Sequence, residues 1–416
     1  MARNRVIYQS EALFVGPKAG GEHTAHNELH RVQNISHDMS ATRTDIFEFG
    51  RLAALDKVMI EAPTVSLDFG YLLTNGENEK NIGLVVEQQT AGYVGGNYMG
   101  SDTLPNATSG IIANPGADND EKNYYVVTVP EGLDADDDDS YSSSTNNFNS
   151  RSIVGFGNGV LSNYSINGAV GDFASASVSI EAFNISFISG QDAAVSAAWV
   201  SGDAIPTIKK GTNGLQAGTF ALPAPSTGQQ NVFAIRPGDI ILDFDVTDSS
   251  AAFSELSVGG AILPSQDPDT TQEGAAAPEP MHLQNFSIEM PLARTALNRL
   301  GSTFPYYRAI DFPLNVTLNC SALLADVSTG SLVDIMCNDA KRTIEVALRN
   351  PCSANVADGL GDIQSRFRLK NAQLVSQNFS ASIGDNKTVD LSFEATVGGP
   401  SDLNNGLFIS GTANNS

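Results

Sequence analysis

Four stretches of the chain alternate apolar and polar residues with a period of two, which is the pattern of a β-strand with one buried face. The apolar positions are Val65, Leu67, Phe69 and Tyr71 in the first stretch, Val178 and Ile180 in the second, Val316, Leu318, Cys320 and Ala322 in the third, and Val389, Leu391 and Phe393 in the fourth. The polar positions between them include Ser66, Asp68, Thr317 and Asn319. The pattern predicts a mainly β protein whose strands turn one face to a core and the other to a polar setting.

Helical spacing of apolar residues is rarer. The region 77–86 carries Ile82, Val85 and Val86 on one face, with two glutamates near its start where the helix dipole favours them, and Leu332 to Cys337 has a similar spacing. We therefore expect about one flanking helix in each half of the chain. A second candidate helix is Leu292 to Leu300, with a weaker counterpart at Ala41 to Phe49.

The chain contains one segment twice. Residues 32–73 align without a gap on residues 283–324, so that Gln33 falls on Gln284 and the offset is 251 residues. Farther along, Asn158 falls on Asn371 at an offset of 213 residues, and the matches around it keep the same order. Two long copies of one unit indicate tandem domains, because each copy is long enough to own a core.

These matches divide the chain into a first β domain at 1–200, a linker rich in Gly, Pro, Ser and Thr at 201–231, and a second β domain at 232–416. The drop in offset from 251 to 213 makes the first copy 38 residues longer, and we place the excess in an acidic loop insertion near 90–150. The run Asp134 to Asp139 lies there and is expected on an exposed loop, since such a segment buries little apolar surface.

Composition narrows the partners. The formal net charge is −24, with 23 Lys and Arg against 47 Asp and Glu. Tight binding to a nucleic acid needs clustered basic residues that release counterions, and the chain has no basic run. It also has no apolar run of membrane-spanning length and no apolar signal region after Met1, so we expect synthesis in a cytoplasm and no membrane insertion.

The sequence offers no convincing catalytic or cofactor site. The copies share no His or Cys at a matched position, and no nucleophile-and-base set is visible, so we expect a protein that is not an enzyme and needs no cofactor. His23, His26 and His30 lack the spacing of a known metal motif, and we expect no metal site. The Asp134 to Asp139 run lacks the EF-hand spacing of ligands.

One charged position is shared. Arg43 and Arg294 occupy the same place in the two copies, each followed by a threonine. An arginine repeated in this way can pair with a carboxylate at a subunit contact, and a local surface salt bridge is an equally good interpretation.

The matched segments resemble the major tail tube proteins of long-tailed, siphovirus-like bacteriophages. The resemblance lies in four stretches: Leu283 to Met290, Leu292 to Gly301, Arg308 to Leu318, and the hairpin-like Asn163 to Ser179. It implies β-barrel or sandwich domains, each with one flanking helix, whose sheets join into a ring around a channel for DNA. Having two such domains in one chain departs from most family members.

The resemblance implies a virion tail protein, made in the host cytoplasm, that assembles with itself in stacked rings. Its other expected partners are tail proteins such as the tape measure and terminator, together with DNA in non-specific passage. If both copies join the ring, three chains supply six domains. Ser66, Asp68, Thr317 and Asn319 are then candidates for the channel lining, and Arg43 and Arg294 for subunit contacts. The alternative is a tandem β-sandwich adhesin or another surface- or carbohydrate-binding virion protein, although the chain has one Trp and few aromatics for sugar contact.

Overall fold

The computed structural model describes residues 11–17, 27–88, 106–113, 120–128, 152–189, 195–196, 209–210, 235, 240–243, 256–258, 261–263, 282–301, 305–323, 341–350, 362–380 and 388–411. The described chain is mainly β, which confirms the predicted fold class. Its two helices are α1 (Glu77–Asn81) and α2 (Ser109–Ala113).

The strands of the first copy are β1 (Glu11–Pro17), β2 (Asn27–Glu28), β3 (Val32–Ser40), β4 (Arg43–Ile46), β5 (Asp56–Met59), β6 (Thr64–Leu72), β7 (Val86–Gln88), β8 (Glu121–Thr128), β9 (Ser152–Ala169), β10 (Ser175–Ala182) and β11 (Asn184–Ser189). Those of the second copy are β14 (Ile240–Asp243), β17 (His282–Pro291), β18 (Arg294–Leu297), β19 (Tyr307–Ile310), β20 (Asn315–Leu323), β21 (Arg342–Asn350), β22 (Asp362–Ser380), β23 (Thr388–Thr396) and β24 (Gly406–Gly411). Two short hairpins pair β12 (Val195–Ser196) with β13 (Lys209–Lys210), and β15 (Leu256–Val258) with β16 (Ala261–Leu263).

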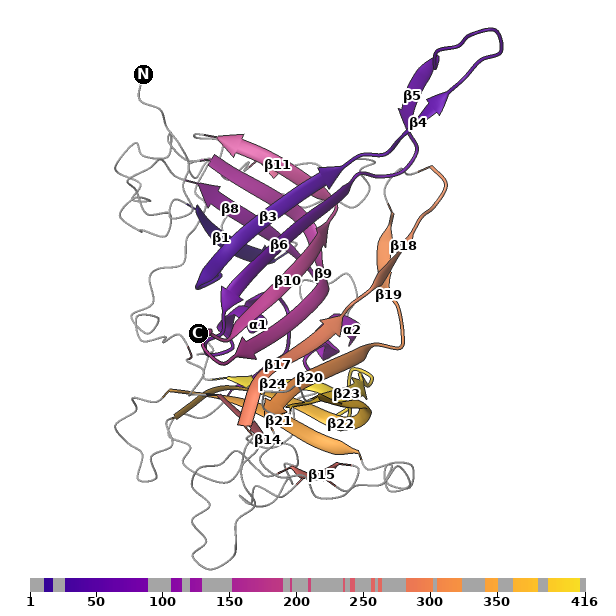
Figure 1. Ribbon diagram of the computed structural model, residues 1–416. Coiled ribbons are helices and arrows are strands. Elements are labelled where there is room, and N and C mark those ends of the chain that lie inside the picture. The colour runs from indigo at the N-terminus through magenta and orange to yellow at the C-terminus, as the bar shows by residue number, and fades with distance from the viewer. Residues whose placement is uncertain are drawn as a thin grey trace, which may run out of the picture.

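Both copies contribute to one 16-stranded sheet. In the first copy the neighbouring strands run β3-β6-β10-β9, and in the second they run β17-β20-β23-β22. Strand β9 then pairs with β17, so the sheet passes from one copy into the other without a break (Figure 1). Its outermost strand on the first-copy side is β3.

Strand pairing repeats at the offsets read from the sequence. In the first copy Ser36 lies opposite Asp68, and in the second Ser287 lies opposite Asn319, which is 251 residues later for both partners. The irregularities repeat as well, with a bulge at Gln33 and Gln284, another at Ser162 and Val375, and a left-handed backbone at Asn158 (φ 54°) and Asn371 (φ 58°). Bulges bend and twist a strand, so the two copies share their local bends as well as their strand order.

The region 90–150 is not all insertion, because β8 lies within it and belongs to the sheet. Strand β21 is its counterpart, since Lys122 lies opposite Gly159 and Arg342 lies opposite Ala372, an offset of 220 for the first partner and 213 for the second. Of the 38 extra residues, 31 (251 − 220) therefore precede β8 and only 7 (220 − 213) follow it. The Asp134 to Asp139 run falls outside the described residues, and the domain boundaries stay a prediction.

The predicted helices fare unevenly. Helix α1 begins at Glu77 as expected but ends at Asn81, and Val86 lies in β7 instead. The helix expected at Leu292 to Leu300 is wrong, because β18 pairs with β19 there in an antiparallel hairpin, and β4 pairs with β5 at its counterpart. A short apolar run of this kind fits either period, and pairing with a distant strand decides the outcome. Leu332 to Cys337 falls outside the described residues. Among the described residues, neither helix is long and apolar enough to cross a membrane.

The hairpins project from the sheet. Figure 1 shows β4–β5 standing clear of the body, while β18–β19 runs along the first copy. The large apolar side chains on the first hairpin and its flanks are exposed, among them Ile46, Phe47, Phe49, Leu52, Leu55 and Ile60.

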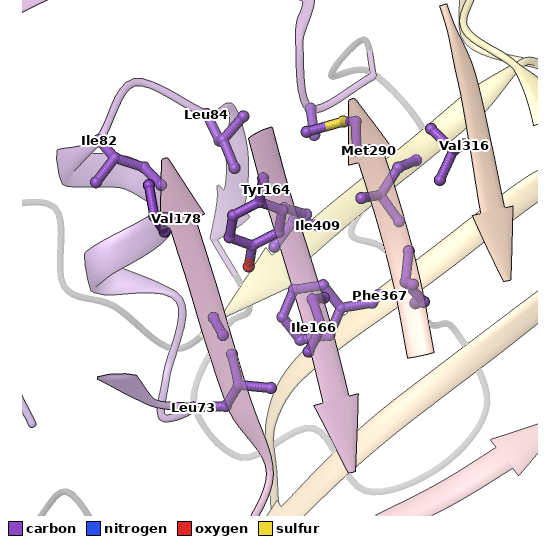
Figure 2. Close-up of a cluster of buried hydrophobic side chains, with 14 of the residues drawn as sticks. Leu73, Ile82, Leu84, Tyr164, Ile166, Val178, Met290, Val316, Phe367 and Ile409 are labelled. Carbon is purple, nitrogen blue, oxygen red and sulfur yellow. The ribbon is translucent and has the colours of Figure 1, made fainter. Parts of the chain in front are cut away.

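A single hydrophobic cluster spans both copies. Figure 2 shows Leu73, Ile82 and Tyr164 of the first copy in the same cluster as Met290 and Ile409 of the second. Cys320 is buried on β20, where desolvation and, secondarily, Asp390 raise the pKa of its thiol to about 12, so it acts as a small core residue.

A buried carboxylate ties α1 to the sheet. Glu79 accepts hydrogen bonds from the hydroxyls of Tyr71 on β6, at 2.9 Å, and Tyr164 on β9, at 3.1 Å. Burial raises the pKa of Glu79, although the backbone and the two tyrosine donors oppose that rise. The sequence-level interpretation of Glu79 as a helix-dipole residue missed this contact, which joins residues up to 85 positions apart.

Candidate functional site

One face of the continuous sheet is polar throughout its central eight strands. Ser66 and Asp68 of β6 and Thr317 and Asn319 of β20 all lie on it, at equivalent positions, between buried neighbours that point to the core. The structure thus gathers these four predicted residues on one surface. Whether that surface lines a channel is not settled by the geometry of one chain.

This polar sheet face is acidic. It carries six carboxylates in the two copies, which are Asp38, Asp68, Glu181, Glu289, Asp390 and Glu394. No Lys or Arg stands on the same face in the described parts of these eight strands. Ser66 lies between Asp38 and Glu181, and its counterpart Thr317 lies between Glu289 and Glu394. Both copies therefore repeat a row of acid, hydroxyl and acid, which repels phosphate groups rather than binding them.

The contact between the copies, which we call the internal junction, is built mainly from β9 and β17. These strands pair antiparallel from Asn163 opposite Pro291 to Ala169 opposite Asn285. On the core side of the ladder, Tyr164 and Met290 are fully buried against each other's strands. Strand β24 adds a second link because it pairs parallel with β7 of the first copy. The internal junction is thus a sheet ladder with a core beneath it.

Arg294 lies inside the internal junction. Its Nη2 atom is 2.6 Å from Oδ1 of Asp120 in the first copy, and both side chains are 0% exposed. Its Nε atom donates to the carbonyl of Leu161 on β9 at 3.2 Å. A buried, hydrogen-bonded ion pair of this kind fixes geometry strongly, because removing either partner leaves a buried charge. Arg43, at the same place in the first copy, is exposed on β4.

A second cation crosses the internal junction near its rim. Nη1 of Arg308 on β19 is 3.2 Å from Oε2 of Glu181 on β10, which remains half exposed. The Arg308 guanidinium also lies over the ring of Phe183, 4.3 Å from the ring centroid. Desolvation lowers the pKa of Arg308, while Glu181 opposes that shift.

The two ends of the sheet carry the same edges in exposed form. On β3, Met39 is 56% exposed, whereas its counterpart Met290 is 0% exposed in the internal junction. On β22, Phe379 is 43% exposed, whereas its counterpart Ile166 is 0% exposed. Within the described residues, β3 pairs only with β6, and residues 376–380 of β22 pair only with β23. Each end of the chain thus offers a strand edge like one that is covered at the internal junction.

Sequence patterns did not reveal Asp120, Arg308 or Glu181 as junction residues. Asp120 precedes β8 in a region interpreted as insertion, and it is absent from the repeat because its counterpart by offset is Ala340. Glu181 and Glu394 do match between the copies, and that shared acid was the available signal. In the described part of the chain, no group of three or more His, Cys, Asp or Glu is arranged to hold a metal ion.

No protein-family model matches the chain, and no curated protein matches it. Among solved structures, a chain in the virion of a native gene transfer agent particle is similar at a TM-score of 0.20 and 9% identity, over 43% of this chain and 98% of the other. The Hcp protein is similar at a TM-score of 0.17 and 10% identity, over 38% of this chain and 90% of the other. At scores this low, neither likeness bears on function.

Proposed function

We propose that this chain is a structural protein of a phage tail, the subunit that forms the tail tube by joining head to tail into stacked rings. The observation that carries the proposal is the presence of two free strand edges equivalent to the two edges covered at the internal junction. A heterologous contact of this kind uses different surfaces on the two partners, so repetition gives either a closed ring or an open filament. The resemblance in sequence to tail tube proteins favours the ring.

Free edges also need a partner for a physical reason. An exposed strand edge presents unpaired backbone groups and invites uncontrolled association, so soluble proteins usually shorten, charge or cover it. Here β3 runs nine residues and carries an exposed Met39 on its core-facing side. Pairing between β3 of one chain and β22 of the next covers both edges at once.

The ring is expected to contain three chains, because each chain supplies two equivalent units and six units then surround the channel. Native mass spectrometry of purified rings should give three times the chain mass of 43.8 kDa, about 131 kDa. Negative-stain images should show rings or tubes with a central hole. Six chains per ring, with the second copy outside the wall, would overturn the stoichiometry. Isolated monomers that bind glycans would favour the adhesin instead.

The acidic polar sheet face is proposed to line the channel, where it gives DNA no phosphate partner and lets it slide. Replacing Asp68 and Asp390 together with lysine should leave assembly intact but make the tubes retain a short DNA duplex roughly tenfold more strongly at low salt, because screening is weak there. Fluorescence anisotropy of a labelled duplex measures the retention.

The matched control for the channel variant reverses two acids away from this face, Glu61 and Asp172, which are both exposed. Tubes of that control should retain no more duplex than the unsubstituted tubes. If the Asp68 and Asp390 variant also retains none at any ionic strength, the face does not line the channel. The proposed role is structural, and no catalytic step is assigned to any of these residues.

A further inference from the structure

We propose that the contact between chains copies the internal junction in strand register, with Lys57 of one chain pairing with Glu394 of the next. This inference rests on the proposed head-to-tail assembly and names the contacts that would set its register. The partner is a second copy of this chain, because the free edges match the covered ones strand for strand.

The internal junction supplies a template for the backbone. Strand β17 corresponds to β3 at an offset of 251, and β9 corresponds to β22 at an offset of 213. Within the internal junction Glu289 lies opposite Ser165, and Ser287 lies opposite Asn167. Transferring these pairs to the free edges sets Asp38 opposite Asn378 of the next chain, and Ser36 opposite its Ser380.

A one-residue slip from this register would be costly. Side chains of a strand alternate between the two faces, so such a slip would turn Met39 toward the polar side and Asp38 toward the core. A two-residue slip keeps the faces and is therefore the competing arrangement. Side-chain charges at the ends of the ladder decide between the two.

Those charges are complementary in the transferred register. Arg308 and Glu181, which pair at 3.2 Å in the internal junction, correspond to Lys57 and Glu394. Both counterparts keep the sign of the original residue. The Lys57 side chain is 64% exposed, with Asp45 of its own hairpin 3.2 Å away, and Glu394 is partly exposed on the polar sheet face. An exposed hairpin cation and a sheet acid are thus placed to meet when two chains join.

Arg43 has a matching place too, but with one difference. Its counterpart Arg294 donates to the carbonyl of Leu161, which corresponds to the carbonyl of Leu374 on the free edge. The carboxylate of Asp120 has no counterpart, because the offset of 220 leads to Ala340. The contact between chains therefore keeps the rim pair and loses the buried pair, which makes its formation more sensitive to salt.

Charge reversal tests the pair. Lys57→Glu or Glu394→Lys alone should slow assembly roughly tenfold at low salt, because like charges then face each other, and the double variant should recover the rate. Light scattering follows assembly. The reversal Arg51→Glu, on the same hairpin but facing no transferred partner, is the matched control and should leave the rate unchanged.

Cross-linking tests the register independently of charge. A variant with Asp38→Cys and Asn378→Cys should form closed three-chain species on a non-reducing gel, because facing residues on antiparallel strands lie within disulfide reach. The shifted pair, Asp38→Cys with Ser376→Cys, should not.

Efficient cross-linking of the shifted pair, or assembly without recovery in the double reversal, would overturn the inferred register alone. Failure of the unsubstituted protein to assemble under any condition would overturn the proposed function as well.

Discussion

Replacing Arg294 with alanine is expected to lower the free energy of unfolding by about 3–5 kcal/mol, the range for breaking a buried ion pair from one side. The substitution leaves the Asp120 carboxylate buried without its 2.6 Å partner and removes the hydrogen bond to the Leu161 carbonyl. Urea unfolding of the isolated chain, followed by circular dichroism, measures the change.

The chain offers its own control for this experiment. Arg43 occupies the equivalent position but is exposed, so Arg43→Ala should change the free energy of unfolding by less than about 0.5 kcal/mol. Equal losses for the two variants would contradict the assignment of Arg294 to the internal junction. Because Arg43 is proposed to meet the next chain, its alanine variant should nevertheless weaken assembly.

Replacing Met39 with lysine is expected to block assembly while leaving the single chain folded. The side chain is 56% exposed now, but its counterpart Met290 is 0% exposed where the copies meet. An ammonium group in that position would be buried without a partner, so the concentration needed for assembly should rise at least roughly 100-fold, or about 3 kcal/mol per contact. Sedimentation over a concentration series measures this threshold.

Two companion variants separate assembly from folding. Met39→Leu keeps an apolar side chain of similar volume and should assemble normally. Met290→Lys makes the same change inside the chain and should instead destabilise folding. If Met39→Lys assembles at the usual concentration, β3 is not an assembly edge and the head-to-tail proposal fails.

Much of the sheet could be predicted from sequence because its strands are amphipathic and duplicated. The alternation around Leu67 and Leu318 identified two central strands and their polar faces, and the constant offsets anticipated equivalent registers. Even the bulge at Gln33 has its counterpart at the matched Gln284.

The failures have a different origin. The hairpin at β18 was mistaken for a helix because Leu292, Ala296 and Leu300 fit a helical stripe, and only pairing with β19 determines the strand. Asp120 was missed because its role depends on Arg294, 174 residues away, and no local pattern encodes such a contact. The exposed state of Arg43 was equally invisible, since the sequence cannot say which of two matched arginines has a covering neighbour.

The internal junction also changes the thermodynamics of assembly. Because β9 and β17 belong to one chain, their contact forms at the high effective concentration that a covalent connection provides, independent of how dilute the protein is. A ring of three chains then needs intermolecular encounters at only half of its contacts, and each avoided encounter spares about 4–15 kcal/mol of lost translational and rotational freedom. The remaining contacts can be individually weak, without a counterpart to the buried Asp120, and still close a ring. A chain of this design stays in solution as a single molecule at low concentration and polymerises over a narrow concentration range.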